Sequence, residues 1–268
     1  MTRPRPERSA PPSPNAPFVA PDALSGRRAV VTGGTRGIGR AIALALARAG
    51  ARVTATYAHA ETDAAATRAA LIEIGDGHQV RHSDTGDPHS VGALFTELRA
   101  RGNIDILVNN AAVTRDGLLM MLSDTAWSDV LATDLGGPFL CTRAALRAMI
   151  AHGFGRIVNV ISPAGLMGKA GASNYAAAKG GLLAMTKSLA AEVACLGITV
   201  NAVCPGVVET DLLSGMVPSA RAAMIARIPA GRPARPDEIA HAVVFLALPH
   251  AGYITGAVLT VDGGLLTG

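Results

Sequence analysis

The stretch "AVVTGGTRGIGRAIALALARAG" (residues 29–50) decides the fold of this chain. A short β-branched apolar run (29–32) leads into a glycine-rich loop, and an alanine- and leucine-rich segment of helical composition (39–50) follows. A buried strand that leads directly into a helix is the unit from which parallel sheets with helices on both faces are built. We therefore expect an α/β fold that begins with this strand and this helix.

The same alternation continues to the end of the chain, with helical stretches such as 142–153 between short apolar runs. It predicts a Rossmann-type doubly wound parallel sheet in three α/β/α layers, folded as a single domain over residues 26–268. Residues 1–25 are rich in proline and arginine, and we expect them to form a disordered tail. The further strands are expected at 52–57, 104–110, 156–162, 197–204 and 257–263, with a weaker candidate at 78–83.

Composition narrows the class of protein. The 268 residues are 49% hydrophobic and 16% charged, with a net charge of +4. This charge is small and dispersed, so nucleic-acid binding is not predicted. No apolar run approaches the roughly 18 residues of a membrane span, and the first residues lack the apolar region of a secretory signal. Cys141, Cys195 and Cys204 are too few and too far apart for a disulfide framework or a zinc site. We expect a cytoplasmic protein without a metal.

Glycines and short polar residues follow four of the expected strands. The stretches are "GGTRGIG" (33–39), "NAAVTRDG" (110–117), Ser162 and "CPGVVETD" (204–211). Ligands of open α/β sheets bind outside the carboxyl ends of the strands. Since independent loops would not all acquire this composition by chance, we expect a binding site at that edge.

The loop "TGGTRGIGR" (32–40) has the features of a phosphate-binding loop. Glycines let the backbone approach a pyrophosphate, and the free N–H groups of a helix start favour its negative charge. The spacing differs from G-x-G-x-x-G, so a plain tight turn is the alternative. The position between strand and helix favours dinucleotide binding. The expected contacts from this loop are Gly33, Thr35, Arg36, Gly37, Ile38 and Gly39.

The region after the second strand indicates which dinucleotide is used. NAD-binding folds usually carry an acidic residue about 20 positions beyond the loop. Counting from Gly39 leads to His59, and no acid directly follows the strand, although Glu61 and Asp63 lie close by. Arg36 and His59 could contact a 2′-phosphate. We therefore predict a preference for NADPH.

The stretch "SNYAAAKGG" (173–181) carries the candidate acid–base group. Tyr175 and Lys179 are four residues apart, so a helix would place them on one face. A nearby ammonium favours the phenolate, which would make Tyr175 a usable general acid or base. The alanines between them would let a cofactor or another helix approach closely. The alternative is an ordinary amphipathic helix whose tyrosine and lysine face solvent.

Taken together, these motifs resemble the short-chain dehydrogenase/reductase family over residues 26 to about 264. "TGGTRGIG" resembles the family's TGxxxGxG loop, "NNAA" (109–112) its NNAG and "PGVVET" (205–210) its PG-to-Thr segment. Ser162 stands 13 residues before Tyr175, as the family's active-site serine does. Within the family the chain is most similar to 3-oxoacyl-[acyl-carrier-protein] reductases. The stretches that carry this likeness are 106–135, 174–212, 228–247 and 253–264.

The resemblance implies a role for each matching residue. Tyr175 would protonate the substrate carbonyl while NADPH delivers hydride, Lys179 would assist the tyrosine and bind the nicotinamide ribose, and Ser162 would hydrogen-bond the carbonyl oxygen. Residues 211 to about 230 would form a mobile flap over the substrate. Without the resemblance, Asp84 could be a helix N-cap and Thr210 a turn residue. The further cofactor contacts implied are Asp84, Thr85, Asn110, Ala111, Ala112, Pro205, Gly206, Val208 and Thr210.

Two departures from the family pattern concern the relay and the partner. The family usually has asparagine 41 residues before the tyrosine, where this chain has Asp134. We expect this carboxylate to lie near Lys179, to raise the lysine pKa and to leave activity intact. Reductases that serve fatty-acid carrier proteins tend to have basic residues where this chain has 151–154 and Leu196. A specialised ketoreductase, for example one acting on a polyketide chain, would not need them.

The leading hypothesis is an NADPH-dependent ketoreductase that acts on a β-keto acyl or polyketide thioester, including one carried on an acyl carrier protein. A reductase or dehydrogenase of free ketones, sugars or other alcohols is the second enzyme hypothesis. A non-catalytic dinucleotide sensor is the alternative from another class. The small-residue face of the helix after Tyr175 predicts self-association, and the resemblance implies a homotetramer.

Overall fold

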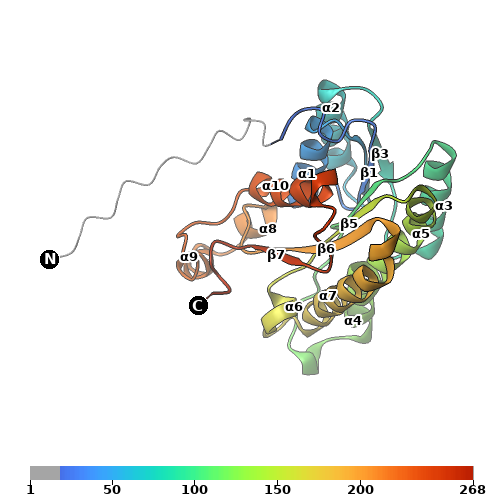
Figure 1. Cartoon of the computed structure of the whole chain (residues 1–268). Coiled ribbons are helices and arrows are strands. Elements are labelled where there is room, and N and C mark those ends of the chain that lie inside the picture. Colours follow the sequence, from blue (N-terminus) through green and yellow to red (C-terminus); the bar gives the residue numbers. More distant parts are fainter. Residues whose placement is uncertain (1–18, 268) are drawn as a thin grey trace.

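The computed structural model describes residues 19–267, apart from the side chain of Leu212. Over that range, seven parallel strands form one sheet in the order β3-β2-β1-β4-β5-β6-β7 (Figure 1). The predicted doubly wound parallel sheet is confirmed, and the weak candidate at 78–83 is the edge strand β3. The strands are β1 Arg28–Val31, β2 Arg52–Tyr57, β3 Gln79–His82, β4 Ile106–Asn109, β5 Gly155–Val160, β6 Ile198–Pro205 and β7 Val258–Val261.

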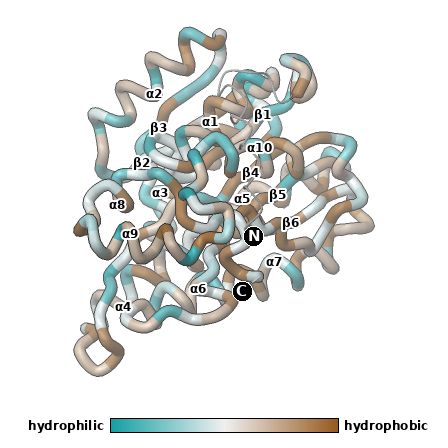
Figure 2. Tube along the Cα trace, turned by 90° about the vertical axis from the view of Figure 1, so that its left-hand side faces the viewer, coloured by the Kyte–Doolittle hydropathy of each residue, from teal (hydrophilic) through white to brown (hydrophobic). Residues whose placement is uncertain are grey.

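Burial explains why the strand sequences are so uniformly apolar. Every residue of β4, β5 and β6 is buried, whereas the edge strands β3 and β7 are partly exposed. Helices cover both faces of the central strands, so neither face alternates with polar residues. Figure 2 shows hydrophobic residues along these strands and polar residues mixed into the outer helix α2 (Glu61–Ile74).

Two groups of helices complete the three predicted layers (Figure 1). On one face, α1 (Gly37–Arg48), α2 and α10 (Pro236–Ala247) share a core that includes Ile42, Leu71 and Val243. On the other, α3 (Pro88–Ala100), α5 (Gly137–His152) and α7 (Ser173–Val193) share a core that includes Phe95, Met149 and Leu189. The shorter elements are η1 Leu119–Met121, α4 Asp124–Leu131, η2 Ala132–Gly136, α6 Ala164–Met167, η3 Ala194–Leu196, α8 Asp211–Ser214, α9 Pro218–Ala226 and η4 Pro249–Ala251.

The helix expected at 142–153 begins five residues earlier, because α4 continues into α5 through the π-helical segment η2. A π-helical turn inserts an extra residue and interrupts the regular helical ladder, and such turns are frequent at functional sites. Asp134 is the central residue of η2. The sequence pattern of an ordinary helix does not reveal this turn.

The packed chain begins upstream of the predicted boundary at residue 26. Leu24 is fully buried in the core with α1, and its N–H donates to the carbonyl of Ala49 at 2.7 Å. The tail was predicted to end near residues 24–26, and Leu24 anchors the residues just before β1 to the core beside α1. Residues 1–18 of the predicted tail lie outside the described residues.

Three general features bear on function. No helix in the range 19–267 is long and apolar enough to cross a membrane. All three cysteines are free, with Cys141 and Cys204 buried and Cys195 exposed. Burial raises the pKa of the Cys141 thiol to about 12, which leaves it unreactive at neutral pH.

Candidate active site

The loops after β1 and β4 are joined by a compact set of hydrogen bonds. The Thr32 hydroxyl accepts the backbone N–H groups of Asn110 at 2.9 Å and Ala111 at 3.1 Å. In return, the Asn110 side-chain amide donates to the carbonyls of Thr32 at 3.0 Å and Gly33 at 3.1 Å. Asn110 was expected to line the cofactor. The structure places its amide against the glycine loop, so it holds the shape of that loop.

The glycine loop is shaped by close backbone approach. A Cβ atom at Gly39 would lie 2.1 Å from the carbonyl oxygen of Gly33 and 2.4 Å from the Asn110 amide nitrogen. Any side chain there would force the loop open. The packing of the loop against itself is enough to require glycine at position 39. A plain tight turn therefore explains Gly39 as well as a bound cofactor does.

The start of α1 provides the stronger argument for a bound anion. Its N-cap residue, Arg36, makes no side-chain capping bond, and its first turn contains no acidic residue. The helices α7 and α9 also lack both features, so the position of α1 directly after the glycine loop is what distinguishes it. The first N–H groups of a helix need acceptors and carry partial positive charge. A pyrophosphate would satisfy both, so the residues present fit a dinucleotide.

The end of β2 does not present the acid typical of NAD binding. The strand ends at Tyr57, and Glu61 and Asp63 lie in the first turn of α2. The Tyr57 hydroxyl donates to Glu61 at 2.7 Å, and this hydrogen bond raises the pKa of Tyr57. Arg36 and His59 are both exposed on this side of the fold.

The segment after β6 reaches the glycine loop. The N–H of Gly206 donates to Val261 at 3.0 Å, and Val208 is buried. The Thr210 methyl group would lie 3.4 Å from a Cβ built at Gly37. The Thr210 hydroxyl also donates to the Val208 carbonyl at 3.5 Å, as a turn residue would. The structure therefore brings Thr210 beside the start of α1.

Asp84 and Thr85 follow β3 at the same edge. The Asp84 carboxylate accepts the N–H of Gly86 at 2.8 Å, while Asp87 caps α3. The alternative that Asp84 is the helix N-cap is therefore wrong. Thr85 is buried beside Gly137 at the start of α5, so its side chain packs within the fold.

Tyr175 and Lys179 lie one turn apart on α7, as predicted. The Lys179 ammonium is 5.6 Å from the centre of the Tyr175 ring and donates to the carbonyl of Val160 at 3.2 Å. Lys179 is only 2% exposed, whereas Tyr175 is partly exposed. The alternative in which both side chains face solvent is wrong, because α7 presses its lysine against the end of β5.

Asp134 extends from η2 to the same lysine. One carboxylate oxygen (Oδ1) accepts the N–H of Val113 at 2.8 Å, and the other (Oδ2) is 3.3 Å from the Lys179 ammonium. Oδ2 has no well-oriented hydrogen bond within the described part of the chain, so this contact is one of opposite charges. Burial raises the pKa of Asp134, although the Lys179 charge and the Val113 N–H oppose that effect. Asp134 thus lies near Lys179, as expected.

Ser162 lies two residues after the end of β5, and its hydroxyl accepts the N–H of Ala164 at 3.3 Å as α6 begins. Gly165 allows α6 to pack closely on α7, since a Cβ there would lie 2.7 Å from the backbone nitrogen of Gly180. This contact places the turn after Ser162 directly beside Lys179. The serine, the tyrosine and the lysine thus come from neighbouring parts of one edge.

The sequence analysis missed Asn174. This side chain is fully buried, and its amide donates to the carbonyls of Arg115 at 3.0 Å and Ala126 at 3.1 Å. Its oxygen accepts the N–H of Tyr175 at 2.8 Å. Asn174 therefore ties the first turn of α7 to α4 and to the loop after β4. Its position next to Tyr175 was the only signal available in the sequence.

A polar network beneath the site was missed as well. The Asn109 amide donates to Asn159 at 2.8 Å, and the Asn159 amide donates to Thr186 at 2.8 Å. These bonds connect β4, β5 and α7 inside the core. Buried polar groups specify a unique arrangement when they are paired, so this network helps to set the position of α7 relative to the sheet.

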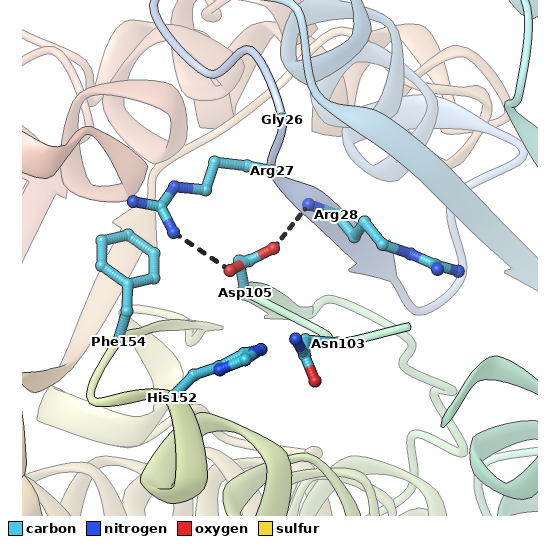
Figure 3. Close-up of a pocket in the computed structure, with 7 residues that line it drawn as sticks. All are labelled: Gly26, Arg27, Arg28, Asn103, Asp105, His152 and Phe154. Atoms are coloured by element: carbon cyan, nitrogen blue, oxygen red, sulfur yellow. Dashed lines mark hydrogen bonds and ion pairs between the residues drawn. The ribbon is translucent and has the colours of Figure 1, made fainter. Parts of the chain in front are cut away.

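A cavity of about 350 Å³ lies at the opposite, amino-terminal edge of the sheet (Figure 3). Arg27, Asp105, His152 and Phe154 are among the residues that line it, and none of the predicted site residues is. Figure 3 shows the Asp105 carboxylate between the side chain of Arg27 and the backbone of Arg28. This cavity is separate from the candidate active site.

Comparisons with known proteins agree with the motifs. A family model described as "Enoyl-(Acyl carrier protein) reductase" matches residues 33–266. The chain is 47% identical over 243 residues to the 3-oxoacyl-[acyl-carrier-protein] reductase FabG of Escherichia coli K12, covering 90% of this chain and 98% of that protein. It is 42% identical to the 3-oxoacyl-[acyl-carrier-protein] reductase of Synechocystis, with 91% and 98% covered.

A solved structure is also similar. A putative gluconate dehydrogenase from Agrobacterium tumefaciens superposes with a TM-score of 0.87 at 35% sequence identity, covering 91% of this chain and 98% of that one. The two chains therefore share a fold, although the name of that protein specifies a different substrate.

Proposed function

The chain belongs to the short-chain dehydrogenase/reductase family, and on this premise we propose that it is an NADPH-dependent ketoreductase of β-keto acyl thioesters. It is an oxidoreductase of the CH–OH/C=O type, and its family implies a nicotinamide dinucleotide cofactor. The observation that carries the proposal is the buried Lys179 beside the accessible Tyr175, with Ser162 on the adjoining turn.

The chain's own residues can manage the proton and the carbonyl. Ser162 would donate a hydrogen bond to the substrate oxygen, and Tyr175 would transfer its hydroxyl proton to that oxygen. When bound, the reduced nicotinamide supplies the hydride that the carbonyl carbon receives. Lys179 would stabilise the negative charge left on the phenol, because its ammonium is held close to the ring at 5.6 Å from the centre.

Two observations support NADPH over NADH. Arg36 and His59 are exposed where a 2′-phosphate would lie, and Glu61 already accepts the Tyr57 hydroxyl at 2.7 Å. Arginine pairs well with phosphate oxygens. We expect kcat/KM to be higher with NADPH and Arg36→Ala to lower it for NADPH far more than for NADH. Equal losses with both cofactors would assign Arg36 to the shared part of the site.

The thioester class is supported by the reductases that the chain resembles at 42–47% identity, whose names specify acyl-carrier-protein substrates. The exposed residues 151–153 and Leu196 offer no lysine or arginine to an acidic carrier protein. We propose a specialised substrate such as a polyketide thioester. The test is NADPH oxidation across β-keto acyl thioesters of varied length and aromaticity, each offered free and on a carrier protein.

A second candidate is a dehydrogenase of sugar acids or other free alcohols, which the gluconate dehydrogenase likeness favours. Simple ketones are offered in the same NADPH-oxidation assay, and oxidation of gluconate is followed in the reverse direction as reduction of NADP+. If the protein turns over these substrates and shows no activity on any thioester, the dehydrogenase of free alcohols replaces the thioester reductase as the proposed function.

Self-association is proposed from the exposed small residues of α7 and apolar residues of α5. Ala177, Ala184 and Ala191 are exposed at helical spacing, and Phe139 and Ile150 are 47% and 46% exposed. Covering them would remove apolar surface from water. We expect a homotetramer in the cytoplasm, and light scattering during size-exclusion chromatography measures the mass of the particle.

A further inference from the structure

A buried carboxylate faces the catalytic lysine from outside its own helix. Asp134 has no exposed surface, and its Oδ2 lies 3.3 Å from the Lys179 ammonium without a hydrogen bond of its own among the described residues. Lys179 is equally hidden and is the cation nearest the Tyr175 ring. Two opposite charges this close interact strongly where water is excluded.

We propose that Asp134 is a positioning residue that offsets part of the effect of the Lys179 charge on Tyr175 and thereby keeps Tyr175 protonated, and so able to donate, up to higher pH. This inference rests on the proposed function. An ammonium alone would draw the proton off the neighbouring phenol. With the carboxylate in place, the lysine and the aspartate together carry no net charge, and the phenol keeps its proton more readily.

The other charges around Tyr175 do not take over this role. Asp116 and Lys169, on the two loops that flank the start of α7, pair with each other at 2.9 Å and are half exposed. Arg115 and Asp129 face each other at 3.9 Å across the loop and α4, also at the surface. Each pair is neutral and screened by water.

Asp84 is the remaining carboxylate near η2. A Cβ built at Gly86 would lie 3.3 Å from its Oδ1 and 3.2 Å from the Thr133 hydroxyl. The Asp84 carboxylate accepts the Gly86 N–H and is partly exposed. Asp134 is therefore the charge that acts on Lys179 at short range. The backbone N–H of Val113 donates to Asp134 Oδ1 at 2.8 Å and favours the ionised form of Asp134.

The sign of the effect follows directly. Asp134→Asn keeps an oxygen for the Val113 N–H but removes the negative charge, so the phenol loses its proton at lower pH. Carbonyl reduction needs the protonated phenol, and alcohol oxidation needs the phenolate. Both the alkaline limb of the reduction profile and the acidic limb of the oxidation profile should move to lower pH, by on the order of one pH unit.

The experiment compares profiles of kcat/KM against pH in both directions for the parent and Asp134→Asn. Asp105→Asn is the matched control, since it removes a buried carboxylate from the opposite edge of the sheet. Asp105→Asn should lower the stability of the protein and leave the midpoints of both kcat/KM profiles unchanged. If the midpoints of Asp134→Asn coincide with those of the parent while only kcat changes, Asp134 is structural and the proposal is overturned.

A titration separates this inference from the proposed function. The chain has three tyrosines, so replacing Tyr57 and Tyr253 with phenylalanine leaves Tyr175 as the only phenol. Its tyrosinate absorbance can be followed without any substrate. Asp134→Asn should lower the midpoint of this absorbance titration by the same amount as it shifts the kcat/KM profiles. An unchanged titration midpoint would contradict the proposal even if no assay substrate were turned over. Asp134→Ala removes the same charge and serves if the asparagine variant does not fold, as judged by circular dichroism.

Discussion

Two buried aspartates lie at opposite edges of the sheet and differ in how completely they are bonded. Asp105, before β4, uses both oxygens: one accepts the backbone N–H of Arg28 at 2.9 Å and the other pairs with Arg27 at 3.1 Å. Asp134 bonds through one oxygen and leaves the other facing Lys179. A fully bonded charge stabilises one arrangement, whereas an incompletely bonded one remains available to act on its neighbours.

The surroundings of the two carboxylates differ in the same way. At the amino-terminal edge, the guanidinium groups of Arg27 and Arg156 flank Phe154 at 3.6 and 4.3 Å from its ring centre (Figure 3 shows Arg27). Arg156 also donates to four backbone carbonyls. These contacts close the bottom of the sheet. At the carboxyl edge, the start of α1 has no side-chain cap, and this edge holds the candidate active site.

The largest effect should come from Tyr175→Phe. Removing the proton donor should lower kcat by about 10³-fold, while the melting temperature stays near that of the parent because the ring is retained. Steady-state rates with NADPH measure the loss of kcat, fluorescence measures whether the variant still binds the cofactor, and a melting curve measures its stability. Tyr253→Phe is the control, since Tyr253 is fully exposed. Unchanged turnover in Tyr175→Phe would refute the assignment of Tyr175 as the acid, whereas a parent protein that binds NADPH tightly but reduces no carbonyl would favour a dinucleotide sensor.

Asp105→Ala should have the opposite effect to Tyr175→Phe, with a loss of stability and little loss of activity. It leaves Arg27 and the Arg28 N–H without their acceptor, and we expect a loss of about 3 kcal/mol in the free energy of unfolding with kcat nearly unchanged. Urea denaturation followed by the fluorescence of Trp127, the single tryptophan, measures this loss. A drop in kcat without loss of stability would mean that the two edges are coupled.

Asn174→Ala tests whether one side chain contributes both to stability and to the position of Tyr175. It removes three hydrogen bonds from the first turn of α7, so we expect about 2 kcal/mol of destabilisation and a roughly tenfold fall in kcat/KM. Asn174→Asp keeps the acceptor for the Tyr175 N–H but turns a buried carboxylate oxygen toward the carbonyls of Arg115 and Ala126, so it should be at least as destabilised as Asn174→Ala. If both variants match the parent in kcat/KM, Asn174 does not position Tyr175.

Glu238→Gln, in the first turn of α10, should have the smallest effect, because the pair that Glu238 forms with Arg232 is partly exposed. Paired with Arg232 at 2.7 Å, Glu238 has its pKa lowered to about 2. A lowered pKa contributes stability above the ordinary glutamate range, and this is lost as the pH falls from about 4.5 toward 2. After screening by water we expect about 1 kcal/mol. Melting curves at neutral and acidic pH should converge for parent and variant on acidification.

The local patterns of the sequence predicted much of the fold. The weak strand at 78–83 formed as β3, and the helix carrying Tyr175 and Lys179 formed as α7, because strand and helix periodicity depend on neighbouring residues. The alternatives that proved wrong concerned what a side chain contacts. Tyr175 and Lys179 could both have faced solvent, but Lys179 packs against the end of β5. Asp84 was a possible cap of α3, but Asp87 takes that position.

By itself, the sequence determined the strand-loop-helix unit at 29–50, the spacing of Ser162, Tyr175 and Lys179, and the edge at which they meet. Only the tertiary structure decided that Lys179 is buried against Val160, that Asn110 braces the glycine loop and that Asp134 faces the lysine from a π-helical turn. The reason is physical. Periodicity is a property of adjacent residues, whereas burial and charge pairing depend on which distant segments pack together.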